Sequence, residues 1–287
     1  MDILENLLGS RTTLMVRRVD VSIIKAYYFL MVGFLLKKSF FDLWDNIFKI
    51  ALVNIGFIVS LSLTVFIPPL FAAVPFMGIG VRLIGFLWCF VYLSAAAMSL
   101  KALSDYGSFG WLEFFGNLKT YWPAGLFLGG FVLLGYIILV MVIPFYLGMD
   151  SIMGLLAATV IFWAMVVAVL SLQFFFAVRA RLDTNLFRVT RKCFIIFFDN
   201  PLFCIFSLFH NFFVLLFSAL VAFLFPGPAA VFLFLDEGLR LRLLKYDWLE
   251  ANPDADRRKI PWDIILIDEQ EKTGSRSLIS IIFPWKE

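Results

Sequence analysis

Long apolar stretches alternate along this chain with short clusters of charged residues. The longest stretches without Asp, Glu, Lys or Arg cover residues 50–81, 120–149, 151–178 and 200–235. A helix needs about 20 apolar residues to cross the ~30 Å hydrocarbon core of a bilayer. The pattern therefore predicts membrane-spanning helices, and it makes the first and last stretches too long for a single crossing.

Prolines divide these two stretches. Pro68 and Pro69 are consecutive, and Pro226 and Pro228 flank Gly227. Each proline removes a backbone donor and clashes with the preceding helical turn. The sequence then predicts six spans, at about Ile47–Phe66, Gly80–Leu100, Thr120–Pro144, Ser151–Val178, Pro201–Phe225 and Ala229–Leu244.

Lys and Arg residues gather in every second link between these spans. They lie before the first span, between the second and third, between the fourth and fifth, and after the sixth. On the opposite side only Arg82 occurs, just inside the second span. Cytoplasmic loops carry an excess of Lys and Arg. The distribution predicts an even number of spans in the cytoplasmic (inner) membrane, with both termini in the cytoplasm.

Three short amphipathic segments precede the first, third and fifth spans: Ser39–Lys49, Phe109–Lys119 and Asn185–Ile195. Each mixes aromatic and charged residues at helical spacing, which is typical of a helix lying in the membrane interface. Asn200 is expected to cap the fifth span, and Pro123 and Pro201 to lie in first helical turns. The predicted fold is an all-α polytopic membrane bundle of three units, each an elbow helix followed by a transmembrane hairpin, repeated at about 70 residues.

The predicted domains are an N-terminal cytoplasmic or interfacial segment (1–46), the six-helix bundle (47–249) and a cytoplasmic tail (250–287). The apolar run Ala26–Leu36 lies in the first of these, and no small-residue cleavage site follows it. Its about 11 residues are too few to cross a bilayer. The run is interpreted either as an interfacial or re-entrant helix or as a short helix buried against the bundle.

Composition narrows the functional classes. Of 287 residues, 62% are hydrophobic and 16% charged, against about 45–50% and about 25% in soluble domains. These values exclude intrinsic disorder, collagen, coiled coils and disulfide-rich secreted folds. The net charge of +3 is too small for a nucleic-acid binder, and one His and three Cys leave too few ligands for a structural zinc cluster.

Sequence motifs of enzymes are missing. The chain has no Gly-rich phosphate loop with Lys, no His-Glu-x-x-His and no Gly-x-Ser-x-Gly. Cys89, Cys193 and Cys204 lack a paired spacing and are expected to be reduced thiols. The sequence predicts a protein that is not an enzyme and has no cofactor or metal.

Four segments resemble the YesL-like family of uncharacterised bacterial integral membrane proteins. They are the first-span entry Ile47–Asn54, the small-residue patch Ala95–Lys101, the aromatic elbow Phe109–Tyr121 and the basic elbow Arg179–Asn200. The resemblance covers roughly Asp42 to Tyr246. The chain departs from the family in its Pro-rich first link and its long charged tail. The resemblance implies a role beside carbohydrate uptake and breakdown systems, without catalytic activity.

Asp236 and Glu237 are the strongest candidates for intramembrane chemistry, since an ionised group at the centre of a spanning helix costs roughly 2.5–3.5 kcal/mol. Arg240, one turn later, can face one of them. One hypothesis is a proton- or cation-coupled site. The other is an internal ion pair that packs the sixth span against Arg179 or Arg181.

His210 lies in the fifth span among phenylalanines. It either relays protons or forms an interhelical hydrogen bond. In the first span, Asn54, Ser60 and Thr64 are expected to form polar contacts between helices or hydrogen bonds back to their own helix.

The tail combines charges with apolar residues. Arg257, Arg258 and Lys259 are expected to contact anionic lipid. A short helix is predicted over Trp262–Lys272, closed by Gly274, with Trp262, Ile265, Leu266 and Glu269 on one face. The apolar end, Ser277–Glu287 with Trp285, docks either on the protein's own elbows or on a cytoplasmic or membrane partner. Trp262 and Trp285 are thus candidate contacts to lipid or to a partner.

Two functional hypotheses follow. The first is a non-enzymatic accessory or assembly protein of the cytoplasmic membrane, serving a carbohydrate-uptake system. The alternative is a small-solute transporter or channel that uses Asp236, Glu237, Arg240 and His210 inside the bundle. The lipid bilayer is the expected partner in both, and nucleic acid in neither.

Overall fold

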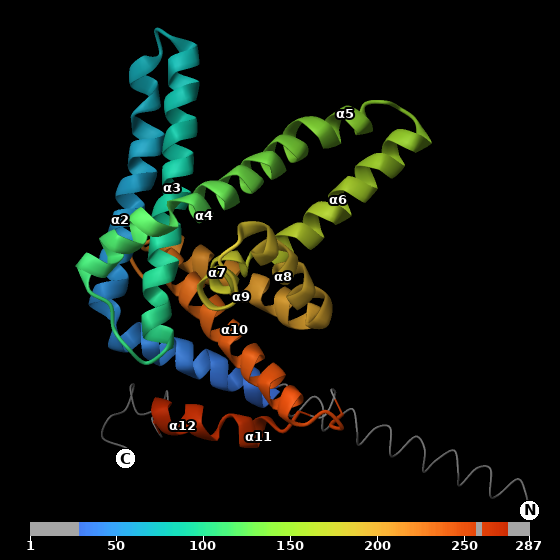
Figure 1. Cartoon of the computed structure of the whole chain (residues 1–287). Helices are drawn as coiled ribbons and strands as arrows, with labels where there is room; N and C mark the ends of the chain where they lie inside the picture. Colours follow the sequence, from blue (N-terminus) through green and yellow to red (C-terminus); the bar gives the residue numbers. More distant parts are fainter. Residues whose placement is uncertain (1–28, 257–259, 275–287) are drawn as a thin grey trace, which may run out of the picture. The chain divides into compact units, whose positions relative to one another are not determined.

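The computed structural model describes residues 29–256 and 260–274, and over these ranges it contains helices and no strand (Figure 1). The structure is 85% helical. Contacts divide it into two compact units, a central unit, Asp42–Leu239, and a terminal unit formed by Met1–Phe41 with Arg240–Glu287. The terminal unit groups the two chain ends that the sequence-based division treats as separate domains, and that division stays a prediction.

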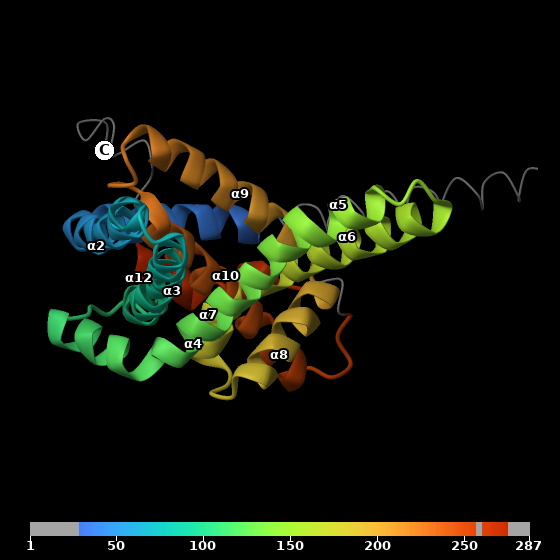
Figure 2. The same ribbon diagram turned by 90° about the horizontal axis from the view of Figure 1, so that it is seen from above.

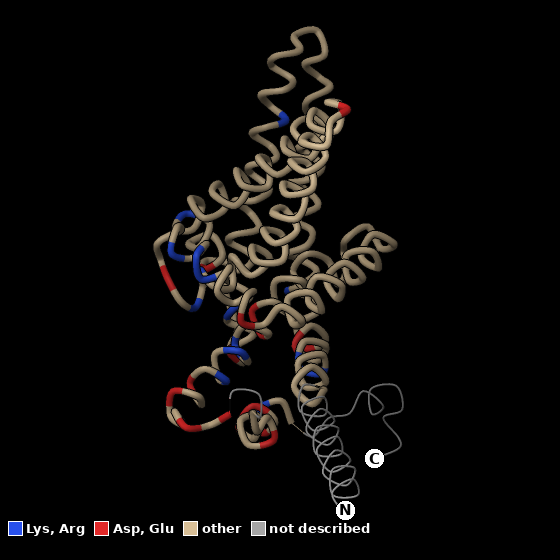
Figure 3. The backbone as a smooth tube through the Cα atoms, turned by 90° about the vertical axis from the view of Figure 1, so that its right-hand side faces the viewer, with Lys and Arg blue, Asp and Glu red and all other residues tan. Residues whose placement is uncertain are grey.

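Helices of membrane-spanning length and composition dominate the central unit. Five of those in the described residues qualify: Ile47–Phe71, Pro75–Ser104, Trp111–Leu147, Ile152–Leu172 and Pro201–Leu220. Figure 3 shows long tan stretches of backbone that carry almost no charged residues. The chain is therefore an all-α membrane protein, as the apolar pattern predicted. Helix α10 (Gly227–Ala251) is long enough but carries several charges, so the sixth crossing stays a prediction.

The first hairpin confirms that the chain breaks at Pro68 and Pro69. Helix α2 (Ile47–Phe66) has the predicted bounds, and Pro68 begins a 3-10 turn, Pro68–Phe71. Helix α3 (Pro75–Ser104) then returns alongside α2 (Figure 1). The Tyr92 hydroxyl of α3 donates to the Val53 carbonyl of α2 at 2.7 Å, which fixes the two helices together near their mid-lengths.

The second hairpin corrects the predicted elbow. Helix α4 (Trp111–Ile137) begins in the elbow and continues through Pro123, so this proline is inside the helix and not in a first turn. Figure 2 shows that the first part of α4 points in a different direction from the rest. Membrane helices tolerate an internal proline with a bend. A π-helical stretch, Ile138–Val142, and helix α5 (Ile143–Leu147) complete this arm, and α6 (Ile152–Leu172) returns beside it.

The predicted span 151–178 is broken. Helix α6 ends at Leu172, and a separate helix, α7, covers Phe175–Arg181. The third elbow is confirmed as helix α8 (Leu186–Asp199), whose first turn is capped by Asn185. Helix α9 (Pro201–Leu220) follows directly, with Pro201 in its first turn.

The expected cap at Asn200 is wrong. Its side chain makes no capping hydrogen bond and instead donates to Asp199 at 2.8 Å. Proline at the first position of α9 removes one of the donors that a cap would satisfy. After α9, the Pro226-Gly227-Pro228 break is confirmed, although α10 begins at Gly227 rather than at Ala229.

An apolar core joins the helices of the central unit. It contains buried residues from α2, α3 and α10 together with the two elbow aromatics Phe109 and Phe114. Phe114 packs against Tyr92 with ring centroids 5.4 Å apart. The elbow at the start of α4 is thus anchored by aromatic residues of its own amphipathic pattern.

Asn54 fastens the break before α10. Its Nδ2 donates to the carbonyls of Leu224 (3.1 Å) and Pro226 (2.8 Å), and its Oδ1 accepts from the N–H of Ala229 at 3.1 Å. This confirms the expected polar contact, and Ser60 and Thr64 bond back to carbonyls of their own helix, also as expected. A single amide therefore satisfies three backbone groups at this break, two carbonyls before α10 and one N–H in its first turn.

Replacing Asn54 by leucine should lower stability by about 1–2 kcal/mol, because three backbone groups lose their partner in an apolar setting. The measurement is the midpoint of thermal unfolding in detergent. Ser60→Ala is the control, since its hydroxyl bonds only within α2 and its loss should change the midpoint little. Equal midpoints for Asn54→Leu and Ser60→Ala would show that the Asn54 bonds are not stabilising.

The terminal unit contains a helix over residues 29–41 that continues to residue 45. Met31, Leu35 and Phe41 are fully buried within it. The tail helix is confirmed, but in two pieces, α11 (Trp262–Ile265) and α12 (Ile267–Thr273), separated at Leu266. The chain leaves α12 at Gly274, whose φ of 81° suits a glycine that ends a helix. Buried and exposed residues alternate along residues 29–41, as in an amphipathic helix, and the placement of the apolar run in the membrane interface or against the bundle stays a prediction.

Candidate functional site

Asp236 lies in the packed interior of the central unit. Asp236 is 3% exposed, and its neighbours Leu233, Phe234 and Leu239 are buried as well. Arg181, the last residue of α7, donates from Nε to Asp236 Oδ1 at 2.9 Å and from Nη2 to Oδ2. Both carboxylate oxygens are therefore held by one guanidinium in the two-pronged geometry that makes such pairs strong.

Arg181 joins three helices. Besides Asp236 of α10, its Nη2 donates to Ser104 Oγ (3.0 Å) and to Asp105 Oδ1 (2.9 Å) at the end of α3. Burial by itself would lower the pKa of Arg181, but hydrogen bonds and attraction from Asp236 and Asp105 outweigh it and raise that pKa above its ordinary value. The guanidinium of Arg181 therefore stays positively charged at physiological pH.

The sequence left two kinds of ion-pair partner open for Asp236 and Glu237: Arg240 in the same helix, or an arginine of another segment. For Asp236 the structure selects Arg181, one of the arginines that belong to the packing hypothesis. Arg240 forms an ion pair of 2.7 Å with Glu269 of α12, within the terminal unit. Glu237 is fully buried in the central unit. Spacing along α10 also offered Arg240 as a local partner, and a partner 55 residues away leaves no periodic trace that could decide between the two.

His210 packs against an aromatic ring of α10. Its imidazole stacks on Phe234 with centroids 3.8 Å apart, and its Nδ1 lies 3.3 Å from Asn211 Oδ1. Phe234 and Asp236 are two positions apart, or about 200° around a helix. His210, in α9, therefore contacts a different face of α10 from the one that carries Asp236. The structure does not bring these two residues into one site.

Helix α9 nevertheless has a polar buried face. It is formed by side chains that recur at helical spacing and are buried, namely Cys204, Ser207, Asn211 and Ser218. Ser218 Oγ accepts from the N–H of Gly227 at 2.9 Å, and the Cys204 carbonyl accepts from Gln173 Nε2 at 2.9 Å. Two of these four residues are thus already engaged in contacts that hold α9 to its neighbours.

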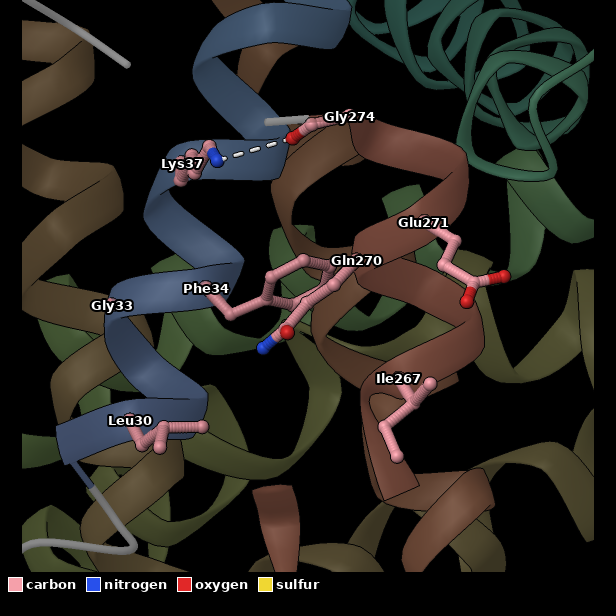
Figure 4. Close-up of a pocket in the computed structure, with 8 residues that line it drawn as sticks. All are labelled: Leu30, Gly33, Phe34, Lys37, Ile267, Gln270, Glu271 and Gly274. Atoms are coloured by element: carbon pink, nitrogen blue, oxygen red, sulfur yellow. Dashed lines mark hydrogen bonds between the residues drawn. The ribbon is translucent and has the colours of Figure 1, made fainter. Parts of the chain in front are cut away.

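A groove lies in the terminal unit between the helix at residues 29–41 and α12 (Figure 4). Its volume is about 570 Å³, and Leu30, Phe34 and Ile267 line it together with polar residues of α12. Lys37 Nζ donates to the Gly274 carbonyl at 3.3 Å at one end. A Cβ built on Gly33 would have no neighbour within 4 Å, so this glycine faces open space.

The predicted contacts of the tail are only partly described. Trp262 is 4% exposed and lies under the guanidinium of Arg242, 5.9 Å from the ring centroid. Its burial, with that of Leu266 and Glu269, matches the face predicted for this helix. Arg257, Arg258, Lys259 and Trp285 lie outside the described residues.

Cys89, Cys193 and Cys204 are buried and form no disulfide. Burial raises the pKa of the Cys193 thiol, in α8, to about 12, so this side chain stays a neutral thiol at physiological pH. Within residues 29–256 and 260–274, no three His, Cys, Asp or Glu side chains are grouped so as to hold a metal ion. Comparison of the chain with protein-family models, with curated proteins and with solved structures finds no match.

Proposed function

We propose that the chain is a non-enzymatic accessory or assembly protein of the cytoplasmic membrane that serves a carbohydrate-uptake system. The observation that carries the proposal is the closed ion pair between Asp236 and Arg181. A transported ion or proton needs an acid that is open to a pathway, whereas this carboxylate has both oxygens occupied by a neighbouring helix. The strongest candidate for transport chemistry is thus used for packing.

The proposed placement in the membrane adds α10 as a sixth crossing, with both termini in the cytoplasm. The alternation of Lys and Arg between links supports this orientation. The ion pair supports the crossing as well, because it offsets part of the cost of an acid within the bilayer. The resemblance to the YesL-like family supports a bacterial cytoplasmic membrane and the link to sugar uptake.

A solute transporter is the second candidate, and the buried polar face of α9 favours it. Ser207 and Asn211 lie on that face, and His210 is next to it, in a helix of membrane-spanning length. Intramembrane His and Asn residues occur along transport pathways. In this alternative, the route follows α9 rather than the Asp236–Arg181 pair.

Purification from the native host in a mild detergent tests the accessory role. We expect a membrane subunit of a sugar importer to co-purify in a fixed ratio with the full chain, as identified by mass spectrometry. A lone, monodisperse protein under the same conditions would contradict the proposal.

Two conservative variants separate the candidates. For an accessory protein, His210→Gln and Asn211→Ser should leave co-purification unchanged, and the purified chain in liposomes should carry no solute or proton flux. For a transporter, the unmodified chain should carry flux, and either variant should reduce it at least tenfold. Phe209→Leu is the control, because Phe209 is next to His210 but points outward.

A further inference from the structure

Helix α8 lies where two membrane-spanning helices end. It contacts α6 and α9. In sequence it comes after the carboxyl end of α6 at Leu172, and only Asn200 separates it from the first residue of α9, Pro201. If α6 and α9 cross the bilayer, α8 is held at the surface where both helices meet the headgroups.

The inward face of α8 is anchored in the protein. Val189, Cys193, Ile196 and Phe197 are buried, and they recur at the three- and four-residue spacing of one helix face. Asn185 Oδ1 accepts from the N–H groups of Phe187 and Arg188 at 3.1 and 3.3 Å, which fixes the first turn. Such a helix presents its opposite face in a defined orientation.

That outward face is apolar where a soluble helix would be polar. Phe187 is 76% exposed, Phe198 71% and Ile195 55%. Large exposed aromatic side chains on one side of a surface helix are typical of helices that insert partly between lipid headgroups. Exposure to water would oppose the hydrophobic effect at each of these positions.

Two arginines share the same face. Arg188 and Arg191 are both exposed. At about 100° per residue, Arg191 lies between Phe187 and Ile195 around the helix, and Arg188 lies about 20° beyond Ile195. The other cation of this helix is engaged elsewhere, since Lys192 Nζ pairs with Asp183 Oδ2 at 3.0 Å and donates to the Leu182 carbonyl.

One acid, Asp199, is also exposed at the carboxyl end of α8, where it accepts from Asn200 Nδ2. Along the helix, the two arginines lie between Phe187 and Ile195, and the acid lies beside Phe198 at the carboxyl end. Apolar side chains with guanidinium groups between them match a surface that offers acyl chains below and phosphates above.

We propose that the outward face of α8 binds anionic phospholipid, with Phe187, Ile195 and Phe198 between the acyl chains and Arg188 and Arg191 on the phosphates. The site requires only that α6 and α9 cross the membrane, and it is independent of the accessory role. It also places an anionic-lipid site in a described helix, separate from the lipid contact expected of the basic cluster in the tail.

Native mass spectrometry of the full chain in detergent, titrated with phosphatidylglycerol or phosphatidylcholine, tests the proposal. Each arginine on an anionic surface is expected to contribute about fivefold in affinity. Arg188→Gln/Arg191→Gln should therefore weaken phosphatidylglycerol binding by about 25-fold and leave phosphatidylcholine binding unchanged. Phe187→Ser/Phe198→Ser should weaken both lipids alike, because acyl chains do not depend on the headgroup.

The matched control is Arg188→Lys/Arg191→Lys, which keeps both positive charges on α8. It should bind phosphatidylglycerol nearly as well as the unmodified chain does. An equal loss of binding in this control and in the glutamine variant would overturn the proposal, as would an unchanged lipid preference in the glutamine variant. The second outcome would assign the face to an acidic protein partner.

Discussion

Replacing Arg181 by methionine should destabilise the protein by about 3–5 kcal/mol, the cost of leaving a buried charge without its partner. Asp236 has both oxygens on this guanidinium, and Ser104 and Asp105 lose a donor in the same variant. The loss is measurable as a lower free energy of unfolding in mixed micelles. Arg188→Met is the control, because Arg188 is exposed on α8 and its removal should change stability by less than about 0.5 kcal/mol.

A second variant tests the reason for that loss. In Arg181→Met/Asp236→Leu the buried acid is gone, and the apolar replacement should recover most of the stability, since buried ion pairs are often no better than well-packed apolar groups. If the double variant is as unstable as Arg181→Met, the cost lies at the α3 end of the arginine and not at Asp236.

Gly125→Ala should be the second most damaging change, with a loss of about 2–3 kcal/mol from overpacking. Gly125 of α4 lies against the backbone of α3, and a Cβ there would be 2.6 Å from the Cα of Val91 and equally close to the Phe90 carbonyl. Backbone cannot rotate aside as a side chain can, so α3 and α4 would have to separate. Thermal unfolding in detergent measures the effect.

Gly130→Ala provides the matched control on the same helix. A Cβ on Gly130 meets nothing within 4 Å, and alanine favours a helix over glycine by about 1 kcal/mol. This variant should therefore be neutral or slightly more stable than the parent. Equal losses in both variants would mean that helix propensity, and not the close approach at Gly125, decides the result.

The spans were predictable because their length is set by the bilayer and not by other parts of the protein. The bounds of α2 and the breaks at Pro68 and Pro226 follow from this requirement and from proline geometry. The same rule failed at Pro123, because a bent membrane helix can continue through a proline. No local pattern marks the interruption of the helix at Gln173 and Phe174.

The candidate site was only partly predictable for a different reason. The composition of α10 made Asp236 conspicuous, since an acid in an apolar helix is costly. Its partner is set by tertiary packing, which brings the end of α7 to α10. The sequence predicted an amphipathic helix at α8, but it did not show which side packs against the protein. The exposure of Phe187 and Phe198 shows that they lie on the outward side.

The long sequence separation of Arg181 and Asp236 also affects synthesis. The ribosome completes α7 well before it makes residue 236, so Arg181 first has only Ser104 and Asp105 as partners, and Asp236 follows 55 residues later. A chain halted after α9 lacks the carboxylate that holds this guanidinium through two hydrogen bonds. We therefore expect membrane quality control to distinguish such fragments from the finished protein.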